Sequence, residues 1–156
     1  MSRYTDSYMR NHCIDVFFQY RQYQIHVLTY GSMIPEPLNN KENNREIQRM
    51  VALRQQENEL QGEAEVNQSY LTRARIIGEA FEQVFDPIVT TVWFMPFAKM
   101  GFYSYDCIYA NERMSLFKLV ARPVQPQNNM ELTGFDDIIV TNYLDGEIPE
   151  SFIWEW

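Results

Sequence analysis

The sequence predicts an α+β domain that combines an antiparallel β-sheet with two consecutive helices, in the order ββ-αα-ββββ. Apolar and polar residues alternate along two N-terminal segments, which is typical of strands. Apolar residues recur every three or four positions in the centre of the chain, as on one face of a helix. The C-terminal half is rich in β-branched and aromatic residues. Because 156 residues is an ordinary size for one domain, we expect a single domain over residues 1–156.

The first two strands are expected at residues 14–20 and 23–29, where the alternation is clearest. The pair Arg21-Gln22 between them predicts a hairpin turn, although neither residue is the Gly or Asn that tight hairpin turns prefer. Gly31 and the following prolines end the second strand. Residues 1–12 precede this pattern, and we expect them to form an extended or frayed N-terminal arm.

Two helices are expected next. Asn39 or Asn40 can cap a helix that begins near Lys41, and Gly62 ends or bends it. The second helix shows a single apolar stripe at Val66, Tyr70, Ala74, Ile77, Phe81 and Val84. This stripe is interpreted as core packing, and the residue before Pro87 closes the helix.

The remainder of the chain predicts four further strands, at residues 88–94, 101–110, 114–121 and 138–143. Residues 111–113 form a turn between the middle two, and residues 123–137 form a polar loop. Residues 138–156 make an acidic C-terminal segment, in which Asp145 and Gly146 form a turn. The residues Phe152, Ile153 and Trp154 are expected to pack at the end of the chain or to dock elsewhere.

Composition excludes several classes of protein. With 46% hydrophobic and 15% aromatic residues the chain should fold, and a net charge of −8 argues against a nonspecific grip on nucleic acid. The most apolar stretch, 88–98, is too short to span a membrane, and the N-terminus lacks the apolar run of a signal peptide. We therefore expect a cytoplasmic or virion protein whose two cysteines, Cys13 and Cys107, are free and buried.

We find no motif for catalysis, cofactor binding or metal binding. His12 and His26 lack metal-ligand spacing, and a nucleophile pair of Cys107 with His26 has no supporting local pattern. The six glycines are isolated, so the sequence contains no phosphate-binding loop. No catalytic residue, cofactor, metal or small-molecule ligand is predicted.

The charges are distributed unevenly along the chain. Up to Arg122 there are 13 basic and 14 acidic residues, and beyond it there are seven acidic residues and no basic one. Ten of the basic residues are Arg, the cation best suited to pairing with carboxylates at interfaces. An acidic C-terminal face could therefore meet the Arg-bearing first helix of another copy, head to tail. The interface candidates are Arg45, Arg49, Arg54, Asp136, Asp137, Glu147, Glu150, Trp154 and Trp156.

Five segments resemble patterns in proteins of crAss-like bacteriophages: IDVFF at 14–18, IHVLTYG at 25–31, IP at 34–35, AKMGFYSYD at 98–106 and LVARP at 119–123. The resemblance covers about a third of the chain. It implies a small virion component of the head–tail connector, where rings of small α+β subunits stack beneath the portal. It implies no catalytic residue.

Three hypotheses about function follow. The first is a non-enzymatic assembly protein, such as a connector ring subunit, that binds neighbouring copies and a portal or tail component. The second is a small acidic binding or inhibitor module, of the immunity or anti-defence type, that blocks a basic target site. The third is a hydrolase that uses Asp136, Asp137 or Glu147, which would require one of these carboxylates to be buried in a cleft.

Overall fold

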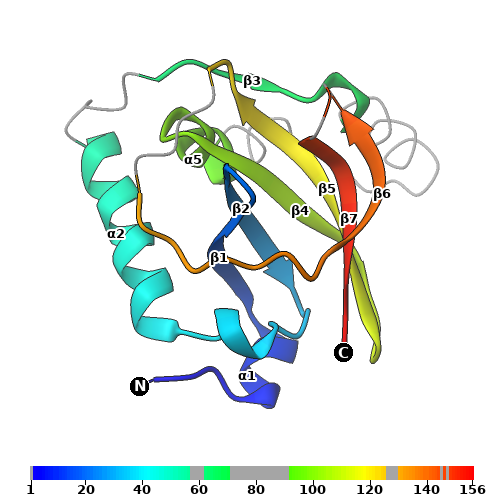
Figure 1. Ribbon diagram of the computed structural model, residues 1–156. Helices are drawn as coiled ribbons and strands as arrows, with labels where there is room; N and C mark the ends of the chain where they lie inside the picture. The colour runs from blue at the N-terminus through cyan, green and yellow to red at the C-terminus, as the bar shows by residue number, and fades with distance from the viewer. Residues whose placement is uncertain (1, 57–61, 71–91, 126–129, 145, 147) are drawn as a thin grey trace, which may run out of the picture.

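The computed structural model describes residues 2–56, 62–70, 92–125, 130–144, 146 and 148–156 (Figure 1). Its helices are α1 (Asp6–Asn11), the 3-10 helix η1 (Glu36–Leu38), α2 (Lys41–Gln56) and α5 (Met95–Lys99). Its strands are β1 (Cys13–Tyr20), β2 (Tyr23–Tyr30), β3 (Ala64–Val66), β4 (Phe102–Ala110), β5 (Met114–Pro123), β6 (Ile139–Leu144) and β7 (Ile148–Glu155).

All seven strands belong to one sheet, in the order β1-β2-β4-β5-β7-β6, with β3 paired to β5. Every pair is antiparallel except β2 and β4, which are parallel. A parallel pair needs a long crossover, and the chain between β2 and β4 supplies it with η1, α2, β3 and α5. The chain is thus α+β with a mostly antiparallel sheet.

The sheet curls around the main hydrophobic core. Phe18 of β1 lies 5.9 Å from Trp154 and 6.3 Å from Phe152 of β7, measured between ring centroids, although β7 is four strands away from β1 in the sheet. The chain before β6 runs across the opening (Figure 1), and Gln19 exchanges backbone hydrogen bonds with Thr133 and Phe135 there. The core is therefore enclosed by one face of the curled sheet and by this segment.

Helices α2 and α5 pack on the opposite face of the sheet. Ile47 and Val51 of α2 join Phe97 of α5 and Phe17 and Phe102 of the strands in a second apolar cluster. The amide oxygen of Asn44 in α2 accepts a hydrogen bond from the backbone N–H of Phe17, so α2 also covers part of the outer edge of β1. None of the described helices combines the length and the apolar character required to cross a bilayer.

Several expectations are confirmed. The hairpin of β1 and β2 turns at Arg21, whose φ of 54° is the left-handed geometry that such turns require. Helix α2 begins at Lys41, and the side chain of Asn40 accepts a hydrogen bond from the backbone N–H of Asn43, as a cap does. β4, β5 and β6 lie within a residue or two of their predicted positions.

Other expectations are wrong. The order with two consecutive helices is not found, since β3 follows α2 and contains Val66; residues 71–84 of the predicted second helix lie outside the described residues. Val92 and Trp93 are helical and not part of a strand, while 88–91 are not described. Residues 1–12 are not only an extended arm, since they include α1, which is capped by the Thr5 hydroxyl. Phe152 and Trp154 do pack in the core at the end of the chain, and they do so as part of β7.

Candidate functional site

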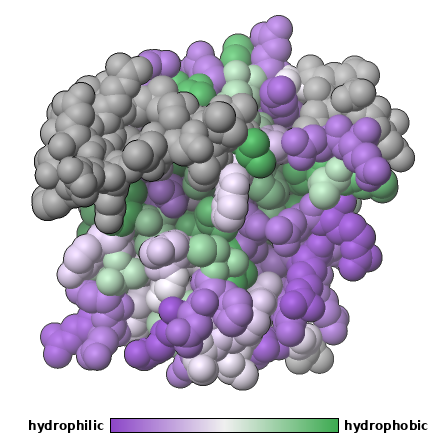
Figure 2. Space-filling model, turned by 180° about the vertical axis from the view of Figure 1, so that it is seen from behind, coloured by the Kyte–Doolittle hydropathy of each residue, from purple (hydrophilic) through white to green (hydrophobic). Residues whose placement is uncertain are grey.

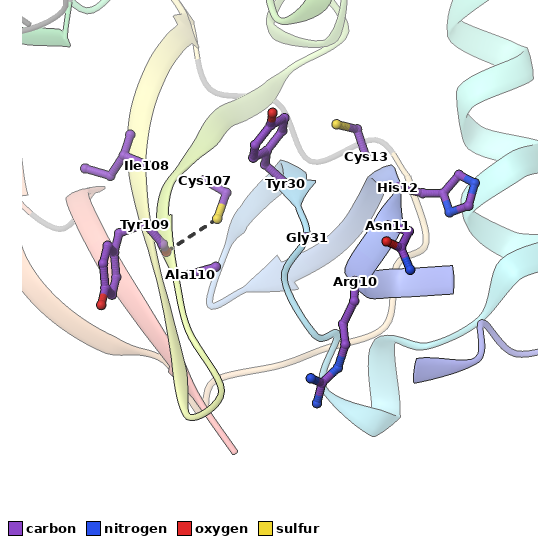
Figure 3. Close-up of a pocket in the computed structure, with 10 residues that line it drawn as sticks. All are labelled: Arg10, Asn11, His12, Cys13, Tyr30, Gly31, Cys107, Ile108, Tyr109 and Ala110. Carbon is purple, nitrogen blue, oxygen red and sulfur yellow. Dashed lines mark hydrogen bonds between the residues drawn. The ribbon is translucent and has the colours of Figure 1, made fainter. Parts of the chain in front are cut away.

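A pocket of about 660 Å³ lies where the parallel strands β2 and β4 approach their carboxyl ends (Figure 3). Parallel strands commonly place ligand sites at this end because the chain must leave the sheet there. The pocket is lined by Arg10, Asn11, His12, Cys13, Tyr30, Gly31, Cys107, Ile108, Tyr109 and Ala110. We call it the basic-aromatic pocket.

Gly31 brings the two sides of the pocket together. Its φ of +72° lies in the left-handed region, which residues with a Cβ rarely adopt. A Cβ at this position would also lie 3.1 Å from the carbonyl oxygen of Arg10. The end of α1 can therefore rest directly against the end of β2. Figure 3 shows Arg10, Asn11 and His12 on one side of Gly31 and Ile108 and Tyr109 on the other.

Three large side chains at this pocket are exposed: Tyr30 is 71% exposed, Tyr109 54% and Ile108 37%. Ile108 is an extra residue in β4, since Cys107 pairs with Phe117 and Tyr109 with the adjacent Leu116. Such a bulge commonly redirects side chains near functional sites. We call Tyr30, Ile108 and Tyr109 the aromatic rim. Seen from behind, the molecule shows apolar and near-neutral residues in the middle of its face and hydrophilic ones towards the lower edge (Figure 2).

The charged side chain that lines the pocket is basic, and a histidine lies beside it. Arg10 and His12 both line it, and no Asp or Glu is among the lining residues described. The ring of His12 stacks on Tyr8 at 3.8 Å, and its Nδ1 donates to the carbonyl oxygen of Tyr8 at 2.9 Å. Because a carbonyl only accepts hydrogen bonds, Nδ1 must carry a proton. The pocket therefore suits a ligand group that is negative or accepts hydrogen bonds.

Neither cysteine at the pocket has the features of a catalytic nucleophile. Cys13 is exposed, which corrects the expectation that both thiols are buried. Partial burial, followed by the nearby carboxylates of Asp106 and Asp15, raises the pKa of Cys13. Burial raises the pKa of Cys107 to about 11, and its thiol donates to the carbonyl oxygen of Tyr109 at 3.5 Å. A reactive cysteine needs a lowered pKa, so both are poor nucleophiles.

A chain of hydrogen bonds crosses three strands on the helix-covered face of the sheet and continues to α2, from a buried end at Ser104 to an exposed end at Gln48. Nδ1 of His26 lies 2.5 Å from Oγ of Ser104, and Nε2 lies 2.7 Å from Oδ1 of Asp15. Nε2 of Gln48, in α2, donates to Oδ2 of Asp15 at 2.8 Å. The ring of Phe97 stacks on His26 at 3.9 Å. The chain thus joins β4, β2, β1 and α2.

These are the three side-chain types of a hydrolytic triad, but their order relative to the surface is reversed. A nucleophilic serine must meet its substrate, and Ser104 is fully buried in the middle of a strand. The carboxylate of Asp15 is the end that reaches the surface, with 14% of its side chain exposed. The arrangement therefore fixes Asp15 in position, with no exposed nucleophile.

The predicted interface residues are dispersed. Arg45 and Arg49 lie exposed on the outer side of α2, whereas Arg54 lines a separate pocket with Glu131 of the same copy. Asp137 is exposed, and Asp136 accepts a hydrogen bond from the backbone N–H of Arg21 at the β1–β2 turn. Asp136 therefore contributes to the fold of its own copy, while Asp137 is available at the surface.

The remaining predicted residues lie on or near β7. Glu150 pairs with Lys118 of β5 at 3.7 Å and accepts a hydrogen bond from Asn142, so it is not a free interface group. Trp154 is fully buried in the main core, which corrects its assignment to an interface. Trp156 is exposed, and its indole N–H donates to the carbonyl oxygen of Glu112. Glu147 lies outside the described residues.

Sequence reasoning missed Arg10, Tyr30 and Tyr109, because their proximity depends on the parallel pairing of β2 with β4. It also missed Asp15, although a single carboxylate inside an otherwise apolar strand is a signal that could have been used. Within the described ranges, no three His, Cys, Asp or Glu side chains are placed to hold a metal ion. No family model, curated protein or solved structure matches this chain.

Proposed function

We propose that this protein is a non-enzymatic assembly protein whose copies associate through the basic-aromatic pocket and its aromatic rim. The exposed acidic residues that follow Arg122 in a second copy, among them Asp137 and Glu155, form the complementary surface. This agrees with the resemblance to ring-forming subunits of phage connectors, and a portal or tail component is then a further partner.

The aromatic rim is the observation that carries the proposal. Tyr and other large side chains dominate the centres of protein interfaces, where they bury much area at little entropic cost. Tyr30, Ile108 and Tyr109 are exposed together around one concavity, and solvent-exposed apolar groups gathered in this way usually mark a contact site.

Charge supports the choice of a second copy as the partner. The pocket offers the cation of Arg10, whereas every charged residue after Arg122 is acidic, and both Asp137 and Glu155 are exposed. Opposite charges steer such surfaces together and fix their register. The two surfaces differ, so the contact is heterologous and closes into a ring when the rotation between copies allows it.

Light scattering after size-exclusion chromatography tests the proposal. Wild-type protein is expected to form oligomers that weaken between about 0.05 and 0.5 M salt, because salt screens exposed charges. Tyr30→Ser and Tyr109→Ser should each weaken association about 30-fold, corresponding to about 2 kcal/mol per central aromatic side chain. Leu53→Ser is the matched control, since Leu53 is 52% exposed on α2 and lies neither in the pocket nor in the acidic part of the chain after Arg122.

Charge reversal locates the contact. Arg10→Glu should weaken association, whereas Arg49→Glu on α2 should not. If Arg49→Glu alone weakens association, the contact uses α2 and the pocket is not the interface. A wild-type protein that stays monomeric at every concentration and salt would overturn self-assembly and favour the acidic inhibitor module.

A further inference from the structure

A second cleft, of about 290 Å³, lies between α2 and the segment that leads into α5. Its lining is Asp15, Gln48, Val51, Ala52, Gln55, Val92, Trp93, Pro96 and Phe97. We call it the Asp15 cleft. It shares no residue with the basic-aromatic pocket. Its volume lies near the lower limit of ligand pockets, which suits a single side chain better than a large cofactor.

Asp15 is the only charged residue among the described lining of this cleft, and its carboxylate is mostly buried. Within the described part of the chain its ion-pair partner is His26, and no Lys or Arg lies within ion-pair distance of it. A neutral imidazole satisfies the whole chain, because the Ser104 hydroxyl can donate to Nδ1 while Nε2–H donates to Asp15. In this arrangement Asp15 keeps its full negative charge at the cleft.

The two hydrogen bonds to Asp15 fix the position of its carboxylate but do not use all of its capacity to accept hydrogen bonds. Oδ1 accepts from His26 and Oδ2 from Gln48, and each carboxylate oxygen can accept a further hydrogen bond. A mostly buried carboxylate with no Lys or Arg beside it in the described part of the chain is costly, and a cation in the cleft would compensate it. The hydrogen-bonded chain thus presents a preformed acceptor.

The walls of the cleft suit a cation on an apolar stem. Trp93 is 47% exposed, and the face of an aromatic ring attracts ammonium and guanidinium groups. Val51, Val92 and Pro96 offer apolar contact to a methylene chain. The side-chain carbonyls of Gln48 and Gln55 can accept further N–H bonds. An anion would be repelled by Asp15, and a purely apolar group would leave the carboxylate without solvent.

We propose that the Asp15 cleft binds the side chain of an arginine or lysine that belongs to a partner polypeptide. The net charge of −8 attracts basic partners, which favours a polypeptide source. The cleft and the basic-aromatic pocket have opposite charge preferences, so this inference stands independently of self-assembly through the pocket.

Titration with short peptides, followed by NMR of the tryptophan indole N–H signals, tests the proposal. An acetylated, amidated Gly-Arg-Gly peptide should shift the Trp93 signal saturably and leave the signal of the buried Trp154 unchanged. The same peptide with citrulline, a neutral analogue of arginine, is the matched control and should bind about tenfold more weakly, because a hydrogen bond between charged groups is lost. Equal binding of both peptides would overturn the proposal.

Variants of the protein place the cation in the cleft. Asp15→Asn should weaken peptide binding about tenfold, and Asp6→Asn, at an exposed carboxylate outside the cleft, should not. If Asp15→Asn does not fold, Trp93→Ala serves in its place, with peptide binding followed by titration calorimetry because the Trp93 signal is lost. Trp93 is 47% exposed, so its side chain can be removed with little effect on the core. Unchanged binding by the folded variant would overturn the assignment. Free propylguanidinium that binds as tightly as the peptide would overturn the polypeptide source.

Discussion

Oδ1 of Asp15 lies 2.7 Å from Nε2 of His26, so a fully buried imidazole ties a carboxylate at the surface to a serine in the middle of the sheet. The three residues come from β1, β2 and β4, and His26 and Ser104 face each other in the register of the parallel pair. A buried polar chain of this kind stabilises the fold only while every member is satisfied. Its removal is therefore measurable as a change in stability.

Ser104→Ala should lower the free energy of unfolding by about 1–3 kcal/mol, because Nδ1 of the buried His26 loses its partner and water cannot replace it. Urea unfolding followed by circular dichroism measures this change. Ser7→Ala, on the exposed side of α1, is the control and should stay within about 0.5 kcal/mol of the wild type. Equal effects of both substitutions would show that the hydrogen bond between Ser104 and His26 contributes nothing to the free energy of unfolding.

Gly31→Ala should destabilise the protein by about 1–2 kcal/mol, because a Cβ is unfavourable at its positive φ and approaches the carbonyl oxygen of Arg10. Gly134→Ala is the control, since its φ is not positive and a Cβ there would meet no atom within 4 Å. Thermal unfolding of the two variants measures the difference. If both variants melt at the same temperature, α1 does not depend on Gly31.

The first hairpin could be predicted from the sequence, whereas the sites could not. Alternating residues mark β1 and β2 because one face of each is buried, and the pattern is local. The sequence does not indicate β7, because Pro149 and Glu150 interrupt the apolar pattern of that strand. The strand forms because its backbone pairs with β5 on one side and with β6 on the other. Tyr30 and Ile108 become neighbours only through the parallel pairing of β2 with β4, which follows from the crossover and not from either strand.

The two thiols should react at very different rates with an aromatic disulfide reagent. Cys13 is exposed and Cys107 is buried, with its pKa raised to about 11 by that burial. Because the thiolate is the reactive form, at pH 8 only on the order of one Cys107 in a thousand is ionised. One thiol should therefore react quickly and the other only on unfolding. Cys13→Ser should abolish the fast phase and Cys107→Ser should preserve it. The reverse result would contradict the exposure of Cys13 and the burial of Cys107.

Asp106 should give stability a distinctive pH dependence. Its carboxylate accepts a hydrogen bond from the Tyr70 hydroxyl at 2.8 Å, yet burial outweighs this bond and raises the pKa from 3.8 to about 6. Between these two values the folded protein binds more protons at this site than the unfolded chain does. The contribution of Asp106 to the free energy of unfolding therefore falls as the pH rises from about 4 to about 6.

Asp106→Asn removes this dependence, because the amide does not ionise and its oxygen can still accept from Tyr70. The difference in unfolding free energy between the variant and the wild type should grow in favour of the variant by roughly 1–3 kcal/mol between pH 3.5 and pH 7. All other carboxylates titrate in both proteins, so their contributions cancel in the difference. Asp137→Asn provides the exposed control, for which the same difference should stay nearly flat. A flat difference for Asp106→Asn would mean that water reaches the carboxylate of Asp106 and that Tyr70 does not pack closely against β4.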